Sequence, residues 1–384
     1  MAIRLIAGAM SGTSADGVDV AIVAVDGRGL GMSAKLVHHN TSPYESHLRR
    51  EIFEIRQQQS VELRNLTRIG REISLAYAAA VRNASREAGV ALHDLAAIAA
   101  HGQTLFHDPP DTLQWIDPAA LAAQLNVQVI SDFRRADCAA GGQGAPLVPF
   151  AEYLLFRHPT RNRVLLNLGG IANLTVLPAG ATIDKLIAFD TGPGNCISDW
   201  ICRTLDARGP GYDPGGQRAQ LGKSYAPLVF DMLLRHDYFR RPAPKSTDIS
   251  EMLSLYRRSR DRFFFENGPL SPEDELATAC ELTVQAIRRA LDNPDGIKVQ
   301  WDELIVSGGG TQNRAIMGRL QALTDPNRPQ SILTSDALGV PPEAKEAVAF
   351  ALLGAATLDG IPSNVPSCTG ANRAVVLGSI TPRP

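Results

Sequence analysis

The chain has 384 residues, of which 44% are hydrophobic and 20% charged, and its formal net charge at pH 7 is −2. This composition is typical of a globular protein with sizeable cores, and the length predicts two domains. The small negative charge disfavours nucleic acids and anionic membrane surfaces as partners, so we expect a small-molecule ligand.

The cysteine pattern argues against disulfides and zinc. None of the five cysteines belongs to a CxxC pair, and an odd number does not suit a disulfide framework. No apolar run approaches the roughly 18 residues that cross a bilayer, and the first residues have a strand pattern rather than the pattern of a signal peptide. We therefore expect a cytoplasmic protein.

Strands and helices alternate in the first part of the chain, after an opening series of strands. Strands are predicted over residues 3–10, 18–25, 35–40, 95–100 and 127–130, and helices over residues 46–58, 61–87 and 118–125. This order predicts an α/β fold. The segment 132–149, DFRRADCAAGGQGAPLVP, interrupts the pattern and could cross between two domains.

The second part of the chain begins with another hairpin that has a glycine-containing bend, which suggests a second, related domain. Strands are predicted over residues 164–168, 174–177, 187–189 and 303–306, and helices over residues 196–205, 273–292, 314–323 and 342–358. Residues 208–247 are rich in glycine, proline and basic residues. We expect this region to consist largely of loops.

The first hairpin, GAMSGTSADGVDVAIV at residues 8–23, has a polar bend. Small residues let a backbone approach a ligand closely, and successive N–H groups with serine and threonine hydroxyls can bind an anion. An aspartate such as Asp16 could hold Mg²⁺ through water. The bend is therefore either a simple chain-reversing turn or a phosphate-binding loop.

The letters SGTSA in this hairpin also look like the serine segment of a subtilisin-type protease. Such a protease needs a histidine base and an oxyanion hole besides its nucleophile. Ser14 lies near the N-terminus, and a strand pattern follows it within four residues. His101 could serve as a base, but nothing in the sequence marks an oxyanion donor, so the protease interpretation is disfavoured.

Two other glycine-rich segments follow predicted strands and precede predicted helices. FDTGPGN, residues 189–195, brings Asp190 to a strand end, where α/β proteins bind ligands, although an aspartate there is often only a cap. VSGGGTQN, residues 306–313, would let a flat group such as a nucleotide base lie against the backbone. The sequence has neither a GxGxxG fingerprint nor a GxxxxGK[ST] P-loop, so a nucleotide enzyme would need another phosphate-binding plan.

Several other polar residues allow both a functional and a purely structural interpretation. HGQTLFHD, residues 101–108, has two histidines six positions apart, which is not a usual metal spacing, so a hydrogen-bonded loop is at least as well supported. Arg134 and Arg135 could bind phosphate or carboxylate, or could form ordinary ion pairs. Glu346, near a predicted helix start, could simply complement the helix dipole.

Taken together, six segments resemble the anhydro-N-acetylmuramic acid kinase family in order and spacing, from residue 8 to about residue 378. They are GAMSGTSADGVDVAIV, HGQTLFH, DFRRADCAAGGQGAPLVP, NLGGIANLT, FDTGPGNCISDW and VSGGGTQN. More broadly, the chain resembles the superfamily of sugar kinases, actin and heat-shock chaperones. The resemblance implies an α/β, two-domain actin-like ATPase fold of ribonuclease H-like type with a deep interdomain cleft.

The resemblance also implies an activity. The expected enzyme uses ATP and Mg²⁺ to open the 1,6-anhydro bridge of 1,6-anhydro-N-acetylmuramic acid with water and to phosphorylate O6. The product is N-acetylmuramic acid 6-phosphate, and the process is peptidoglycan recycling. A homodimer is expected from the family. A kinase for another amino sugar and a non-catalytic, nucleotide-gated binding module remain as alternatives.

The resemblance further assigns roles to individual residues. Asp190 falls at the position of the general base, and Asp16 is expected to hold Mg²⁺. The residues expected to contact the sugar are His101, Gln103, Arg134 and Glu346. The residues expected to bind ATP are Gly12, Thr13, Ser14, Ala15, Asp16, Gly17, Val18, Asp19, Gly192, Gly194, Asn195, Gly308, Gly309 and Gly310. The expected domains are residues 1–133 with about 366–384, on the side of the phosphate loop and sugar, and residues 134–365, on the side of the base and adenosine.

Overall fold

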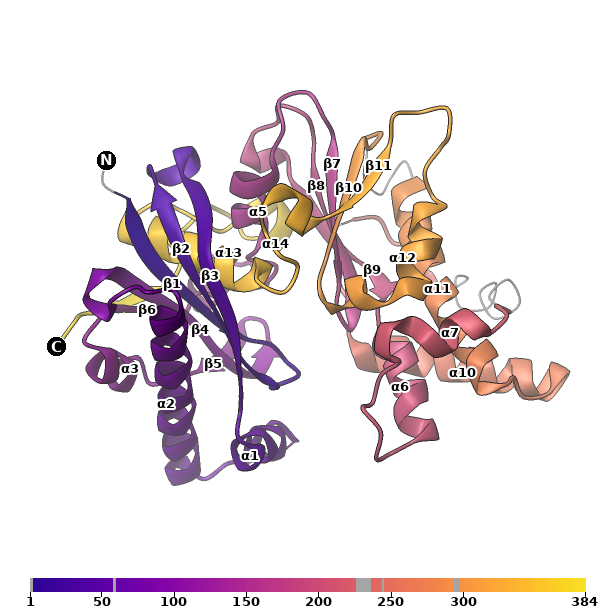
Figure 1. Cartoon of the computed structure of the whole chain (residues 1–384), viewed down its shortest axis with the longest axis horizontal. Coiled ribbons are helices and arrows are strands. Elements are labelled where there is room, and N and C mark those ends of the chain that lie inside the picture. Colours follow the sequence, from indigo (N-terminus) through magenta and orange to yellow (C-terminus); the bar gives the residue numbers. More distant parts are fainter. Residues whose placement is uncertain (1–2, 58–59, 226–235, 244, 293–296, 298) are drawn as a thin grey trace. The chain divides into compact units, whose positions relative to one another are not determined.

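The computed structural model describes residues 3–57, 60–225, 236–243, 245–292, 297 and 299–384 (Figure 1). The chain divides into two compact units. Unit 1 comprises Met1–Phe156 and Ala344–Pro384, and unit 2 comprises Arg157–Glu343. Residue 58 of the first expected helix, and residues 226–235 and 244 of the expected loop-rich region, lie outside the described residues.

The boundaries between the units differ from the expected ones at residues 133 and 365. Residues 134–156 and 344–365 belong to unit 1. The reason is packing: helix α13 (Lys345–Leu358) lies against the strands of unit 1 and against helix α5 (Pro149–Phe156). Arg134 and Glu346 are therefore residues of unit 1 and not of the second domain.

Unit 1 is built on a sheet with the strand order β12-β6-β4-β1-β2-β3, and β5 pairs with β4 outside this order. The strands are β1 (Arg4–Ser11), β2 (Gly17–Asp26), β3 (Ser33–Pro43), β4 (Leu95–Asp108), β5 (Asp111–Trp115), β6 (Val129–Ser131) and β12 (Ser379–Thr381). Strands β1, β2 and β3 form an antiparallel series, while β4 runs parallel to both β1 and β6. The expected loop at residues 101–108 is thus part of a strand.

The helices of unit 1 surround this sheet. They are α1 (Ser46–Gln57), α2 (Leu63–Glu87), α3 (Pro118–Leu125), α4 (Arg135–Ala139), α5, α13 and α14 (Pro366–Thr369). Helix α13 is apolar on nearly every side and is buried along almost its whole length, as such a helix must be. It approaches β1 so closely that a Cβ at Gly8 would lie 1.9 Å from the carbonyl oxygen of Ala347.

Unit 2 has a sheet with the order β11-β10-β7-β8-β9. The strands are β7 (Arg163–Leu168), β8 (Ile171–Leu177), β9 (Ile187–Pro193), β10 (Glu303–Ser307) and β11 (Ser331–Thr334). Among its described residues, the helices are α6 (Cys196–Leu205), α7 (Gln217–Leu221), α9 (Asp237–Arg240), α10 (Ile249–Asn267), α11 (Pro272–Asp292) and α12 (Arg314–Gln321). The strand β10 is buried along its whole length, as a parallel strand inside an α/β sheet is expected to be.

The two sheets share one topology. In each unit, three antiparallel strands come first, and two parallel strands are then added beside the first strand: β4 and β6 beside β1, and β10 and β11 beside β7. This is the strand arrangement of the ribonuclease H-like, actin-type fold, so the expected pair of related α/β domains is confirmed. None of the described helices is long and apolar enough to cross a membrane.

Candidate active site

The bend between β1 and β2 is the expected phosphate loop, and it belongs to unit 1. The N–H group of Ala15 donates to the carbonyl of Gly12 at 3.1 Å, and Ala15 has a positive φ of 48°, so the chain reverses tightly. The side chains of Thr13, Ser14 and Asp16 are exposed. The hydroxyls and the carboxylate are thus accessible on a tight bend, which is a suitable geometry for binding an anion.

Gly17, Val18 and Asp19 were expected in the loop, but they lie in β2. A Cβ at Gly17 would lie 2.3 Å from the carbonyl oxygen of Ser42, so the pairing of β2 with β3 requires glycine here. Asp19 accepts a hydrogen bond from the hydroxyl of Thr41 at 2.5 Å, and burial raises its pKa. These three residues support the loop from its strand side.

Two arginines of α1 that were not expected at the site flank the loop. Arg49 forms an ion pair with Asp16 at 2.6 Å, and Nη1 of Arg56 donates to the carbonyl of Thr13 at 2.6 Å. Both guanidinium groups lie over the ring of Phe53, at 5.7 and 5.6 Å from its centroid. Arginines seven residues apart lie on the same face of a helix, so their spacing predicts that this face is basic. The spacing does not predict which part of the fold the face contacts.

The expected Mg²⁺ at Asp16 is compatible with this loop. Mg²⁺ prefers oxygen ligands, keeps several waters and binds proteins through one or two carboxylates besides the phosphates of a substrate. Asp16 supplies an exposed carboxylate beside the hydroxyls of Thr13 and Ser14. Within the described part of the chain, no three His, Cys, Asp or Glu side chains form a group that could hold a metal. A single exposed carboxylate, Asp16, fits an ion that is held mainly through water and phosphate.

Gln103 was expected to contact the sugar, but its side chain is fully buried against the phosphate loop. Its Oε1 accepts from the hydroxyl of Ser11 at 2.7 Å, and its Nε2 donates to the carbonyl of Gly12 at 3.1 Å. Both polar ends of the amide are therefore engaged where β1 becomes the loop.

His101 and Arg134, which were also expected at the sugar, are in direct contact. Nε of Arg134 donates to Nε2 of His101 at 2.9 Å, and Nη1 of Arg134 donates to the carbonyl of Gly144 at 2.7 Å. His101 is only 2% exposed, and burial, reinforced by the positive charge of Arg134, holds its pKa well below the ordinary value. The histidine is therefore neutral and buried behind the arginine.

Glu346 lies in the first turn of α13, near Arg134. Burial raises its pKa, and the charges of Lys345 and Arg134 oppose this shift. The neighbouring Lys345 donates to Glu152 at 2.7 Å, and both partners of this ion pair are buried. The structure thus brings His101, Arg134 and Glu346 together in unit 1.

Asp190, the expected general base, lies within β9 of unit 2 and not after its end, where it was expected. Three hydrogen bonds connect it to one following segment. Its N–H donates to the carbonyl of Lys245 at 3.0 Å, its carbonyl accepts from the hydroxyl of Tyr238 at 2.6 Å, and its Oδ2 accepts from the N–H of Thr247 at 3.0 Å. Burial raises the pKa of Asp190 to about 6, although the N–H of Thr247 and the charge of Lys245 lower it.

The glycines of FDTGPGN allow close backbone packing. Gly192 has a φ of 141°, and a Cβ at Gly194 would lie 2.3 Å from the carbonyl oxygen of Gly169. The N–H of Asn195 donates to the same carbonyl at 2.8 Å. The segment that precedes α6 is therefore held against the turn between β7 and β8.

The triple glycine after β10 packs beside this segment. Gly308 has a φ of 84°, and a Cβ at Gly310 would lie 2.5 Å from the Cβ of Leu168 and 3.2 Å from Nδ2 of Asn195. A Cβ at Gly309 would have no neighbour within 4 Å. Two of the three glycines are thus needed for packing, while Gly309 presents its backbone to open space.

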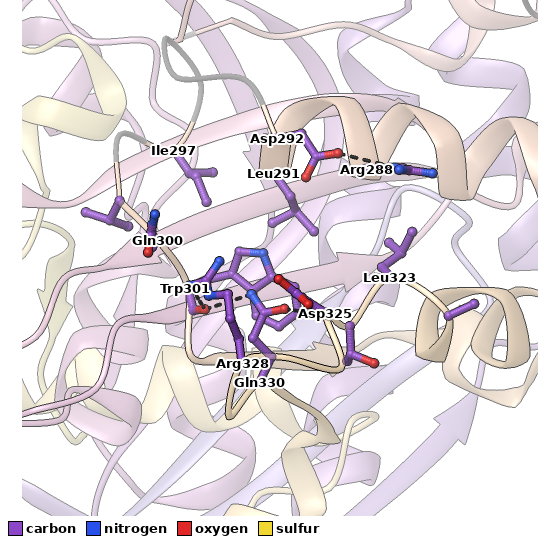
Figure 2. Close-up of a pocket in the computed structure, with 13 residues that line it drawn as sticks. Arg288, Leu291, Asp292, Ile297, Gln300, Trp301, Leu323, Asp325, Arg328 and Gln330 are labelled. Carbon is purple, nitrogen blue, oxygen red and sulfur yellow. Dashed lines mark hydrogen bonds and ion pairs between the residues drawn. The ribbon is translucent and has the colours of Figure 1, made fainter.

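A cavity of about 790 Å³ lies in another part of unit 2 (Figure 2). It is found beside the residues that precede β10, whereas the triple glycine follows that strand. Its polar groups bind one another: Arg288 donates to Asp292, and Gln330 donates to the carbonyl of Trp301 at 3.1 Å. None of the expected site residues lines it.

Comparison with known proteins identifies the family. A family model described as anhydro-N-acetylmuramic acid kinase matches residues 4–383. The anhydro-N-acetylmuramic acid kinases of Bacillus cereus (strain ATCC 10987 / NRS 248) and Bacillus thuringiensis subsp. konkukian (strain 97-27) are 37% and 38% identical over 392 residues, with 98% of each chain covered.

The chain is also distantly similar to solved structures. One is the activator of the 2-hydroxyisocaproyl-CoA dehydratase from Clostridium difficile with bound ADPNP, with a TM-score of 0.44, 12% identity and 92% and 94% of the two chains covered. Another is a ROK family glucokinase from Streptomyces griseus in complex with glucose and AMPPNP, with a TM-score of 0.38, 14% identity and 92% and 98% covered. These TM-scores are too low to carry an argument, and the assignment depends on the full-length sequence matches. The chain belongs to the anhydro-N-acetylmuramic acid kinase family.

Proposed function

We propose that this protein is an ATP-dependent kinase that acts on 1,6-anhydro-N-acetylmuramic acid. It opens the 1,6-anhydro bridge with water and transfers the γ-phosphoryl group of ATP to O6, which gives N-acetylmuramic acid 6-phosphate and ADP. The reaction serves peptidoglycan recycling. Full-length relatives at 37–38% identity that carry this activity in their names support the proposal.

The observation that carries the proposal is the environment of Asp190. Its carboxylate is mostly buried on an edge strand, held by the N–H of Thr247, and its pKa is raised to about 6. At pH 7 such a carboxylate is still ionised, and it is a stronger base than an ordinary aspartate. A general base works best when its pKa lies close to the working pH.

The chemistry then follows as one balanced sequence. Asp190 takes a proton from a water molecule whose oxygen attacks C1 of the sugar. The C1–O6 bond breaks, and its electron pair goes to O6, which attacks the γ-phosphorus as the bond to the β-phosphate oxygen of ATP breaks. No separate acid is needed for O6, because the phosphoryl group takes the place of a proton.

In unit 1, the loop between β1 and β2 is the proposed phosphate-binding element. Its exposed hydroxyls and the adjacent Arg49 and Arg56 favour a polyanion, because the two guanidinium groups flank the loop. Mg²⁺, when bound, would neutralise the charge that develops on the phosphates, and Asp16 would hold it through water. Arg134 and Glu346 are the proposed polar contacts of the sugar.

In unit 2, Gly309 is the proposed contact for adenosine, because its backbone faces open space between two tightly packed glycines. All five cysteines are buried and none of them forms a disulfide, which supports a reducing compartment such as the cytoplasm. A homodimer, expected from the family, is testable by sedimentation.

The test of this function is product analysis in ¹⁸O-labelled water. The enzyme is incubated with ATP and Mg²⁺ and with either anhydro-N-acetylmuramic acid or reducing amino sugars, and the products are identified by mass spectrometry. The proposal requires ¹⁸O at C1 and phosphate at O6 of the anhydro substrate. Phosphorylation of the reducing sugars alone would instead identify a kinase for another amino sugar.

A further inference from the structure

Strand β4 carries two buried polar side chains that the proposed reaction does not use directly. His101 and Gln103 are 2% and 0% exposed, so neither presents its polar atoms to a ligand. Between them, Gly102 has a φ of 82°, and the pairing of β4 with β1 is irregular at this point. The two side chains reach different partners, and each partner belongs to a different part of the proposed site.

The contact between His101 and Arg134 fixes one tautomer of the histidine. An arginine Nε–H can only donate, so Nε2 of His101 must be the acceptor of the 2.9 Å bond and carries no proton. The proton is then on Nδ1, which donates to the carbonyl of Gly102 at 2.9 Å. A neutral imidazole therefore orients the guanidinium from behind, while Nη1 donates to the carbonyl of Gly144 and fixes the same group from a second side.

The His101 ring also contacts helix α13. Its centroid is 4.7 Å from that of Phe350, which lies one helical turn after Glu346. The ring is thus packed between the arginine and the helix that carries the glutamate. His101 therefore contacts one proposed sugar-binding residue directly and the helix that carries the other.

Gln103 has the corresponding role at the phosphate loop. It accepts from Ser11 through its amide oxygen and donates to the carbonyl of Gly12 through its amide nitrogen, so one side chain binds both residues at once. Ser11 ends β1, and Gly12 begins the bend, so the amide fixes the direction in which the chain leaves the strand.

We propose that β4 is a positioning strand for both substrates: His101, as a neutral acceptor, orients Arg134 toward the sugar, and Gln103 orients the loop toward the phosphates of ATP. This inference rests on the proposed function. It revises the expected direct contacts of His101 and Gln103 with the sugar, and it assigns the two residues to different ligands although they are only two positions apart.

The test is a comparison of His101→Phe with Gln103→Met. The phenylalanine keeps the ring beside Phe350 but removes the acceptor, and the methionine keeps the length of Gln103 but removes both hydrogen bonds. For His101→Phe we expect the KM of the anhydro sugar to rise about tenfold or more, with the KM of ATP within about twofold of wild type. For Gln103→Met we expect the KM of ATP to rise about tenfold or more, with the KM of the anhydro sugar within about twofold of wild type. His101→Gln, which restores an acceptor, should recover most of the affinity for the sugar.

Calorimetric titration of each variant with an ATP analogue, without sugar, separates this inference from the proposed function. If wild-type enzyme does not turn over the anhydro sugar, the function is wrong, but weaker ATP binding by Gln103→Met would still support the role of Gln103. If both variants change the two KM values equally, or if His101→Phe binds the sugar normally, the positioning roles are refuted.

A measurement on the unmodified protein covers the case in which a variant does not fold. In nitrogen-15 spectra of histidine-labelled enzyme, His101 should show an unprotonated Nε2 and a protonated Nδ1 between pH 6 and 8. A protonated Nε2 in this range would overturn its role as an acceptor.

Discussion

Replacing Asp190 by asparagine tests whether the buried carboxylate is kept for catalysis at a cost in stability. The exchange preserves the shape of the side chain and an oxygen that can accept from the N–H of Thr247. It removes the base, so we expect kcat to fall by about 10²- to 10⁴-fold, while ATP binding stays close to wild type. In the wild type, kcat/KM should fall about tenfold per pH unit below about pH 6, where Asp190 becomes protonated.

The same substitution should stabilise the protein at neutral pH. The pKa of Asp190 is about 6 in the folded state, against an ordinary value of 3.8, so folding favours the protonated form. The resulting stability is fully present below about pH 4 and is lost as the pH rises through about 6. Keeping the group ionised at pH 7.5 costs at most about 3 kcal/mol. For a unit of this size, relief of that cost raises the melting temperature by at most roughly 6–12 °C.

Thermal unfolding at pH 7.5 and pH 4 measures this effect. Asp190→Asn should melt higher than wild type at pH 7.5 and close to it at pH 4. Asp199→Asn is the matched control, because burial also raises the pKa of Asp199 in α6 to about 6, but this residue has no proposed part in the chemistry. It should gain stability and keep its activity. An active Asp190→Asn enzyme, or equal stability gains at both pH values, would refute this reasoning.

Three other substitutions test the loop and the core of unit 1. Arg56→Gln should raise the KM of ATP several-fold and weaken its dependence on salt, because one of the two cations that flank the loop is lost; an unchanged KM would exclude a role in binding ATP. Gly8→Ala should prevent stable folding, because its Cβ would lie 1.9 Å from the carbonyl oxygen of Ala347, and circular dichroism would detect this. Lys345→Met should destabilise the protein by about 3–5 kcal/mol by leaving Glu152 charged and buried, and adding Glu152→Leu should recover much of this loss in denaturant titrations; no recovery would contradict the ion-pair argument.

The sequence predicted correctly those helices and strands whose ends are determined by neighbouring residues. Helix α3 runs from Pro118 to Leu125 as predicted, because Asp117 caps its start and Asn126 ends it in a left-handed conformation. Helix α10 escaped prediction, because its polar composition masks its buried residues. The full length of β4 was also missed, since its second half is a strand only through its pairing with β5.

The glycine-rich segments were found because their residue types are required by close backbone contacts. The partners of these segments were not found, because they come from distant parts of the chain. The backbone and the carboxylate of Asp190 are bound by residues about fifty positions later, and the loop arginines come from a helix that could have packed elsewhere. His101 and Gln103 were expected at the sugar for the same reason. Their burial depends on the surrounding strands of the sheet, which come from distant parts of the chain.

The burial of all five thiols makes this enzyme convenient for site-specific labelling. A maleimide reagent should leave the native cysteines largely untouched, so an introduced cysteine can carry a probe without a cysteine-free background. Leu63 in unit 1 and Phe265 in unit 2 are 79% and 92% exposed. A donor and an acceptor dye at these two positions would measure, by single-molecule energy transfer, the distance between the units with and without substrates.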